Sequence, residues 1–204
     1  MPQAKPKSSI KIRPAELEDL DALHDLEKAS FDTDRLSRRR LRHWIQATNR
    51  EFMVAVEHGR LLGYGLVLFH GATNLARLYS IAIAQEARGK GIGAKLLQAL
   101  EAASVNRQRF FMRLEVAKDN AAAIRLYEST GYVAFGTFED YYEDHRDALR
   151  MQKIIRDAPK RKRGHTVPWY QQTTGFTCGP ASLMAAVATL DARRQPDQAT
   201  ELDI

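Results

Sequence analysis

Residues 78–97 join an apolar strand pattern to a helix through a glycine-rich turn, and they constrain the fold more than any other segment. The stretch from Leu78 to Ala84 is apolar, and helical spacing begins near Gly91. Glycines at alternate positions, 89, 91 and 93, let the backbone turn tightly with its N–H groups uncovered. The first N–H groups of a helix lack partners, and the helix dipole favours negative charge there. This arrangement predicts an anion-binding loop, for which a diphosphate is a natural ligand.

The spacing of the loop excludes two common phosphate-binding motifs. It does not fit the Gly-x-Gly-x-x-Gly fingerprint of dinucleotide-binding folds, and it lacks the Gly-Lys-Ser/Thr ending of a nucleoside-triphosphate loop. Arg88 and Lys90 add cationic donors beside the glycines. A glycine-containing turn with a purely structural role would explain the pattern almost as well at this stage.

Strand and helix patterns alternate along the chain in an order that predicts a mixed sheet with helices on its faces, an α/β (α+β) fold. His58-Gly59 is typical of a hairpin turn, Ser37 of a helix N-cap, and Gly131 of a helix C-terminus. The expected strands are 10–13, 52–56, 61–69, 76–84, 110–117, 132–138 and 148–155, and the expected helices begin at 17, 37, 91 and 120.

The domain organisation follows from changes in composition along 204 residues. We expect a disordered lead over 1–9, a main domain over 10–156, a basic linker over 157–165 and a partial second domain over 166–204. The linker contains the run Lys160 to Arg163, which could contact nucleic acid but is more typical of a solvated connection.

Charge and cysteine content limit which cellular compartment and which kinds of partner fit this chain. The formal charge of +6 fits an anionic ligand or partner, and it fits a basic background equally well. The single cysteine, Cys178, excludes an internal disulfide and favours a reducing compartment. Since neither a secretory signal nor an apolar span is apparent, we predict a cytoplasmic protein without membrane or required nucleic-acid partners. We predict no metal.

Two residues are candidates for proton transfer. Met112, Leu114 and Val116 share one face of the expected strand 110–117, so Glu115 lies on the other face of a buried-looking strand. A carboxylate there could serve as a general base, or it could pair with Arg113 or Arg77.

Tyr127 stands seven residues after Asn120 and therefore on the same helix face. Its phenol could protonate a leaving group, and a core aromatic is the alternative.

The loop Arg88 to Gly93 resembles the Gln/Arg-x-x-Gly-x-Gly/Ala signature of GNAT acetyltransferases, with the expected strand before it and helix after it. The resemblance covers about residues 10–155 and implies the GNAT fold and acetyl-CoA as the acetyl donor. It further implies that loop amides hold the coenzyme A pyrophosphate and that the backbone of the preceding strand holds the pantetheine. The implied cofactor-binding residues are Ile81, Ala82, Ile83, Arg88, Gly89, Lys90, Gly91, Ile92 and Gly93.

The segments Leu114 to Val116 and Asn120 to Tyr132 resemble the bacterial ribosomal-protein-alanine N-acetyltransferases. That resemblance implies Glu115 as general base, Tyr127 as general acid and Asn120 as a cofactor contact, with a protein or peptide N-terminal amine as acceptor. Tyr141-Tyr142 is similar to a tyrosine pair near the substrate of that family. The arginine-rich segment 31–44 matches little of that family's sequence, so the identity of the acceptor stays open.

The segment Val167 to Ala181 resembles the start of a bacteriocin-processing cysteine peptidase domain. The resemblance implies Cys178 as nucleophile and Gln172 as an oxyanion-hole residue; an inert buried cysteine is the alternative. Because no histidine follows His165 in this chain, we expect no peptidase activity from it.

Other functions remain open from the sequence alone. A non-catalytic module could bind acetyl-CoA or a peptide, and a related transferase could acetylate a small amine or a secreted peptide precursor. Release of free thiol from acetyl-CoA in the presence of an amine separates an enzyme from a binding module. The sequence does not indicate the oligomeric state.

Overall fold

The computed structural model describes residues 10–71 and 73–156. The predictions for 1–9, 157–165 and 166–204, including Cys178, fall outside these described residues. The strands are β1 (Lys11–Pro14), β2 (Arg50–Glu57), β3 (Arg60–Phe69), β4 (Leu75–Ile83), β5 (Phe111–Ala117), β6 (Val133–Phe138) and β7 (Ala148–Ile154). The helices are η1 (Leu17–Asp19), α1 (Leu20–Ser30), α2 (Arg38–Gln46), η2 (Gln85–Ala87), α3 (Ile92–Asn106) and α4 (Ala121–Ser129).

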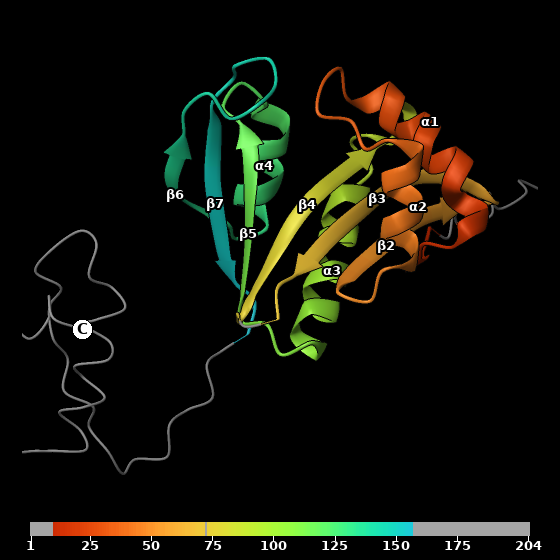
Figure 1. The fold of residues 1–204 in the computed structure, drawn as a ribbon, viewed down its shortest axis with the longest axis horizontal. Helices are drawn as coiled ribbons and strands as arrows, with labels where there is room; N and C mark the ends of the chain where they lie inside the picture. The colour runs from red at the N-terminus through yellow and green to blue at the C-terminus, as the bar shows by residue number, and fades with distance from the viewer. Residues whose placement is uncertain (1–9, 72, 157–204) are drawn as a thin grey trace, which may run out of the picture. The chain divides into compact units, whose positions relative to one another are not determined.

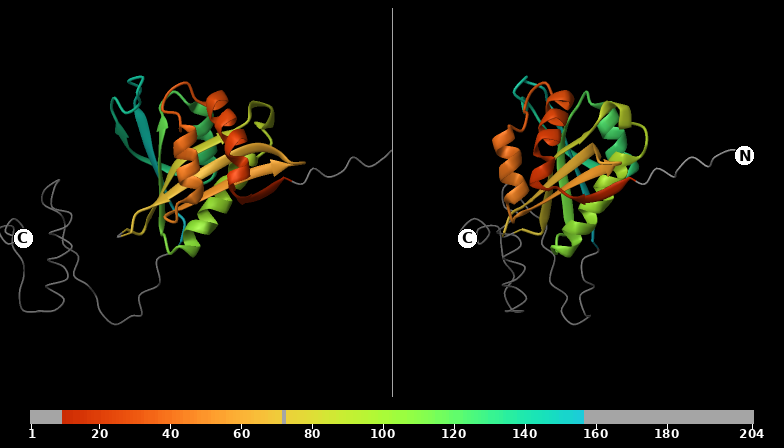
Figure 2. Two further views of the ribbon diagram at one scale, coloured as in Figure 1. Left: turned by 45° about the vertical axis from the view of Figure 1, so that its right-hand side comes forward. Right: turned by 90° about the vertical axis from the view of Figure 1, so that its right-hand side faces the viewer.

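The strands form one seven-stranded mixed sheet in the order β1-β2-β3-β4-β5-β7-β6. The β4–β5 pair is parallel, and the other neighbouring pairs are antiparallel. Two layers of helices cover the sheet: α1 and α2 lie on one face, and α3 lies on the other (Figures 1 and 2). The predicted mixed sheet with helices on both faces is therefore confirmed.

Several local predictions are confirmed by the backbone. Ser37 caps α2 by accepting a hydrogen bond from the N–H of Arg40, at 3.3 Å. His58 and Gly59 both have positive φ, at 50° and 78°, as a tight hairpin between β2 and β3 requires. Gly131 has φ of 92° directly after α4, where a left-handed residue ends the helix.

The first helix differs from its prediction at its N-terminal end. Its first turn is the 3₁₀ segment η1, and regular α1 begins at Leu20 and continues to Ser30. Asp19 explains the change, because its carboxylate accepts from the N–H of Glu16 at 2.9 Å and from Arg13 at 2.6 and 2.8 Å. These bonds fix the turn before the α-helix can begin.

Strands β4 and β5 pair along only part of their length. Leu75 to Arg77 lie opposite Phe111 to Arg113, and beyond them the two strands diverge (Figure 1). On its other side β4 stays paired with β3 as far as Ile83, and β5 stays paired with β7 as far as Ala117. The edge of β4 that faces β5 therefore leaves backbone N–H and C=O groups free for another partner.

Candidate active site

The predicted anion-binding loop has the backbone geometry that its glycines suggest. Gly89 and Gly91 both have φ of +73°, and Gly91 is the N-cap residue of α3 with no side-chain cap bond. A Cβ added to either glycine would meet no protein atom within 4 Å, so the space beside this backbone is open. The first N–H groups of α3 are thus available to an anion, and a diphosphate fits this position.

The next two residues of the loop contribute in a different way. Ile92 is 1% exposed, and its side chain lies in the core. A Cβ on Gly93 would lie 2.9 Å from Cδ2 of Leu126, so any larger residue would require the Leu126 side chain to shift where α3 packs against α4. Only the backbone N–H groups of Ile92 and Gly93 can therefore contact a ligand.

The remaining residues predicted to contact the donor lie beside the loop or along β4. Arg88 donates from Nε to the carbonyl of Ile83 at 3.3 Å, and Lys90 is exposed. Ile81, Ala82 and Ile83 lie on the part of β4 that has separated from β5. Backbone groups of successive residues point to opposite edges of a strand, so only some of these residues present N–H and C=O groups on the side away from β3. The carbonyl of Ile83 already accepts from Arg88.

Asn120 caps α4 through its side chain. Its Oδ1 accepts from the N–H of Ala123 at 3.1 Å, which leaves its amide NH₂ as a free donor. The structure thus gives Asn120 a structural role, and its predicted cofactor contact stays a prediction.

Glu115 lies on β5 close to the point where β4 and β5 diverge, with its side chain 12% exposed. Of the two arginines that could pair with it, Arg77 on β4 is the partner. Arg77 donates from Nε to Oε2 at 3.0 Å, and its Nη2 lies 2.9 Å from the same oxygen in an ion pair. Arg113 instead donates to Gln152 at 3.2 Å. Oε1 of Glu115 accepts no hydrogen bond from a described residue, so it is free to take a proton.

Arg77 extends this contact to the predicted tyrosine pair. Its Nη2 also donates to the hydroxyl oxygen of Tyr141 at 2.6 Å. Burial is the largest influence and acts to lower the pKa of Arg77, but the charges and hydrogen bonds of Glu115 and Tyr141 together outweigh it, so the pKa is raised. From the sequence alone, Arg77 is predicted only as a possible pairing partner of Glu115. Its position opposite Arg113 in the β4–β5 ladder brings it to the site.

Tyr127 lies on α4 with 5% of its surface exposed, and its ring packs edge-on against Tyr132 at 5.8 Å between centroids. Burial raises the pKa of Tyr127, and the nearby Tyr142 adds to the increase. Its phenol is therefore protonated at neutral pH, which is the form that a proton donor requires. Burial, Tyr141 and Glu115 also raise the pKa of Tyr142, to about 12. Tyr142 is thus electrostatically coupled to both Glu115 and Tyr127.

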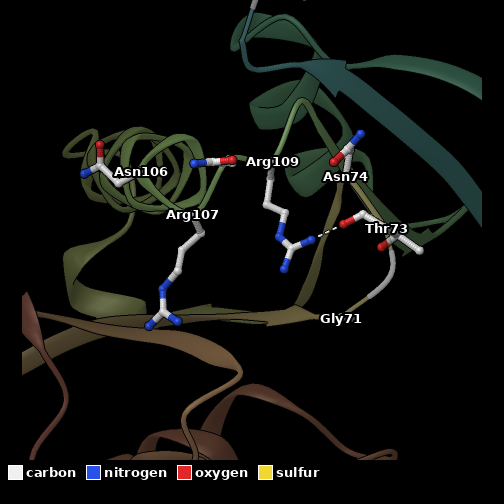
Figure 3. Close-up of a pocket in the computed structure, with 7 residues that line it drawn as sticks. Gly71, Thr73, Asn74, Asn106, Arg107 and Arg109 are labelled. Carbon is white, nitrogen blue, oxygen red and sulfur yellow. Dashed lines mark hydrogen bonds between the residues drawn. The ribbon is translucent and has the colours of Figure 1, made fainter.

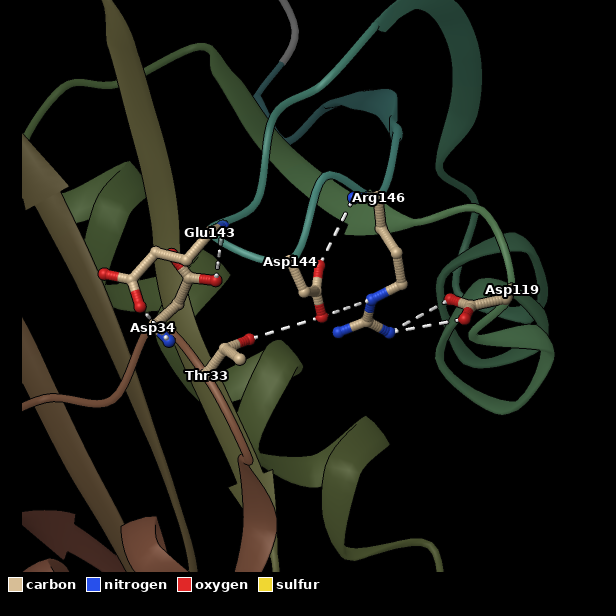
Figure 4. Close-up of polar contacts among 6 residues, drawn as sticks. All are labelled: Thr33, Asp34, Asp119, Glu143, Asp144 and Arg146. Carbon is tan, nitrogen blue, oxygen red and sulfur yellow. Dashed lines mark hydrogen bonds and ion pairs between the residues drawn. The ribbon is translucent and has the colours of Figure 1, made fainter.

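Two loops far apart in the sequence meet through polar contacts (Figure 4), and one of them, the β6–β7 loop, also carries Tyr141 and Tyr142. The N–H of Asp34, in the α1–α2 loop, donates to Glu143 of the β6–β7 loop at 3.4 Å, and the N–H of Glu143 donates back to Asp34 at 3.3 Å. Thr33 donates to Asp144 at 3.4 Å. Arg146 bridges Asp144 and Asp119, at 2.7 and 3.3 Å. These contacts join the two loops next to Tyr141 and Tyr142.

An open pocket of about 500 Å³ lies elsewhere, between the β3–β4 loop and the C-terminal end of α3 (Figure 3). Its two arginines are already engaged: Arg107 pairs with Glu51 at 3.1 Å, and Arg109 donates to the carbonyl of Thr73. Since the glycine loop is at the opposite end of α3, this pocket is separate from the candidate site. Its lining residues are Gly71, Thr73, Asn74, Asn106, Arg107, Gln108 and Arg109.

Comparison with known families agrees with this geometry. The model of the acetyltransferase (GNAT) family matches residues 18–132. The chain belongs to the GNAT acetyltransferase family, and it is an N-acetyltransferase that uses acetyl-CoA. A second family model, described as the Peptidase_C39 like family, matches residues 167–204.

Individual relatives cover nearly the same part of the chain. An uncharacterized N-acetyltransferase from Methanocaldococcus jannaschii is 35% identical over 143 residues, which are 70% of this chain and 90% of that protein. A putative ribosomal-protein-alanine N-acetyltransferase from Bacillus subtilis is 26% identical over 74% of this chain and 99% of its own length. The crystal structure of the Escherichia coli ribosomal-protein-alanine N-acetyltransferase superposes with a TM-score of 0.68 at 25% identity, covering 76% of this chain and 99% of that one.

Within residues 10–71 and 73–156, no helix is both long enough and apolar enough to cross a bilayer. The predicted cytoplasmic location is not tested by this finding and stays a prediction.

Proposed function

We propose that this enzyme acetylates the N-terminal α-amine of a protein or peptide, in the manner of the ribosomal-protein-alanine N-acetyltransferases. The observation that carries the proposal is the position of Glu115, a largely buried carboxylate with one free oxygen at the point where β4 and β5 diverge. The relatives from Bacillus subtilis and Escherichia coli, which bear that activity in their names, support the choice of acceptor.

The proposed reaction is a direct transfer accompanied by proton transfers. Glu115 takes a proton from the ammonium form of the acceptor, directly or through water, and the neutral nitrogen attacks the thioester carbonyl. A C–N bond forms and the C–S bond breaks. Tyr127 supplies the proton that the departing thiolate needs, and the second proton lost by the acetylated nitrogen restores the Tyr127 phenol. The products are an N-acetylated chain and coenzyme A with a free thiol, and Glu115 releases its proton to solvent. The free N–H groups of α3 hold the diphosphate of the donor.

A panel of amines tests the acceptor. Purified enzyme is incubated with acetyl-CoA and one of three amines: an alanine-initiated peptide of ribosomal-protein sequence, the same peptide with its N-terminus already acetylated, or a polyamine. We expect thiol release with the first peptide and none with the blocked one. Equal rates for the free and blocked peptides would place acetylation on a side chain, and a reaction with the polyamine alone would indicate a small-amine enzyme.

The role of Tyr127 is tested by removing one atom. Tyr127→Phe keeps the ring that packs against Tyr132 and deletes the hydroxyl that we assign as proton donor. Because general acid catalysis contributes about 10²-fold or more, kcat should fall by about that factor, with KM for acetyl-CoA unchanged. The measurement is steady-state thiol release with saturating peptide.

Tyr132→Phe is the matched control for Tyr127→Phe. Tyr132 is 2% exposed and forms the other half of the same aromatic pair, and we assign its hydroxyl no part in the reaction. Its kcat should stay within about twofold of the wild type. Equal losses in the two variants would mean that Tyr127 acts through packing alone.

We further propose that residues 10–156 form the acetyltransferase domain and that residues 166–204 begin a cysteine-peptidase-like domain after a basic linker over 157–165. The match of the second family model to residues 167–204 supports this division. In this proposal Cys178 corresponds to the peptidase nucleophile and Gln172 to its oxyanion-hole residue.

A further inference from the structure

One buried carboxyl group, which is not among the proposed catalytic residues, accepts a hydrogen bond on each of its two oxygens. Glu27, near the end of α1, is 2% exposed. Its Oε1 accepts from the N–H of Leu36 at 2.7 Å, and its Oε2 accepts from the hydroxyl of Tyr64. Leu36 belongs to the loop 31–37 that leads into α2, whereas Tyr64 lies on β3, so one side chain joins a helix, a loop and the sheet.

The hydrogen-bond network continues from Tyr64 to β4, the strand whose edge toward β5 is unpaired beyond Arg77. The Tyr64 hydroxyl lies 2.7 Å from Oγ of Ser80 on β4. Ser80 pairs with Leu66 while Leu78 pairs with Val67, so the residue between them, Tyr79, forms a β-bulge. Glu27 is thus connected through two hydroxyl groups to the irregular part of β4.

A buried carboxyl is a costly way to fill this space. Burial raises the pKa of Glu27 and of Tyr64, which reflects the loss of water around both groups. An apolar side chain of similar volume facing apolar partners would pack without that loss. The contribution of this network is therefore positional rather than stabilising. Its hydrogen bonds fix where the loop 31–37 lies relative to β4.

The position of that loop bears on the acceptor side of the site. Thr33 and Asp34, within the same loop, make the contacts to Glu143 and Asp144 shown in Figure 4. The β6–β7 loop also carries Tyr141, whose hydroxyl bonds to Arg77, the partner of Glu115. A shift of the loop 31–37 would be transmitted to the β6–β7 loop and, through Tyr141, to Arg77; we call this side of the site the acceptor-facing wall. Among the described residues, no hydrogen bond joins the glycine loop at α3 to the Glu27 network.

We propose that Glu27 is a positioning residue for the acceptor: it anchors the loop 31–37 to β4 and thereby sets the shape of the acceptor-facing wall. This inference rests on the proposed function for its kinetic consequence, because the wall matters only if an acceptor binds there. Loss of the anchor should weaken acceptor binding and leave acetyl-CoA binding unchanged.

Two substitutions of Glu27 test the anchor. Glu27→Leu fills the space but removes both acceptors, so KM for the acceptor should rise at least fivefold with KM for acetyl-CoA unchanged. Glu27→Gln can still accept from Leu36 through its amide oxygen and can donate its NH₂ to the Tyr64 oxygen. It should therefore stay within about twofold of the wild type and act as the conservative rescue. KM is measured with whichever amine of the panel reacts.

Asp19→Leu provides the matched control. Asp19 is another buried carboxylate, 8% exposed and paired with Arg13, at the start of the same helix. Its loss should lower the melting temperature without changing KM for the acceptor. A similar rise in acceptor KM in Asp19→Leu would show that any destabilisation of α1 has this effect, and it would overturn the proposal.

Hydrogen–deuterium exchange tests the anchor without relying on catalysis. In Glu27→Leu, peptides covering the loop 31–37 should exchange at least tenfold faster, whereas peptides covering residues 88–95 should not change. Unchanged exchange in the loop would overturn the anchor. Faster exchange with an unchanged acceptor KM would overturn the link to the acceptor while leaving the proposed function intact. If the enzyme acetylates no N-terminal peptide, the proposed function fails, and the exchange result still decides the anchor.

Discussion

Gly91→Asp is expected to weaken acetyl-CoA binding by more than about 100-fold, which corresponds to about 2.7 kcal/mol. The new side chain would occupy the open space beside the first turn of α3 and place a negative charge where the diphosphate binds. Two charge-assisted hydrogen bonds to phosphate, at about 1.5–3 kcal/mol each, are enough to account for the loss. Isothermal titration calorimetry with acetyl-CoA measures it directly.

The control for this prediction is Gly59→Asp in the β2–β3 hairpin. Gly59 has φ of +78°, close to the +73° of Gly91, and an added Cβ would likewise meet no atom within 4 Å. The two substitutions therefore impose the same charge and a similar backbone strain, of about 1–2 kcal/mol. Gly59→Asp should bind acetyl-CoA with wild-type affinity. An unchanged affinity in Gly91→Asp would exclude the loop as the diphosphate site.

The second large effect is expected for Glu115→Gln, which should lower kcat at pH 7 by about 100-fold while leaving the Kd for acetyl-CoA unchanged. The amide oxygen can still accept from Arg77, so the geometry of the pair is kept and only the basic oxygen is lost. A free α-amine has a pKa near ~8, so most of the acceptor is protonated at pH 7 and needs a base. As the pH rises above ~8, the deficit of the variant should shrink.

Glu101→Gln is the matched control for Glu115→Gln. The Glu101 side chain is 14% exposed and pairs with Lys153 at 2.7 Å, much as Glu115 is 12% exposed and pairs with Arg77 at 2.9 Å. The same chemical change at Glu101 should leave kcat within about twofold of the wild type at every pH. Near-normal turnover of Glu115→Gln at pH 7 would remove Glu115 as the base.

The sequence was informative wherever a local pattern determines the structure. Glycines at 89 and 91 take the positive φ that the turn requires, and Ser37 caps its helix because a hydroxyl there can accept a backbone N–H. The apolar residues Met112 and Leu114 are buried, as the period of two along β5 predicted.

The sequence could not determine contacts that depend on how distant elements pack. Glu115 had two possible arginine partners, and only the register of β4 against β5 selects Arg77. Glu27 stands seven residues after Leu20 and therefore on the apolar face of its helix, but this spacing does not identify the groups that its carboxylate contacts. One of these groups, Tyr64, is 37 residues away in the sequence. The meeting of the two loops in Figure 4 depends likewise on the whole sheet.

The divergence of β4 from β5 also bears on how the protein avoids unwanted association. A free strand edge at the border of a sheet is a template for strands of other molecules. Here the free stretch of β4 lies in the interior of the sheet, and β5 joins it at Leu75 to Arg77. A foreign strand lying along β4 would meet β5 where the two converge, so it could pair only with the residues of β4 beyond Arg77. The fold thus limits how much strand can be added at this edge, which reduces the risk of aggregation there.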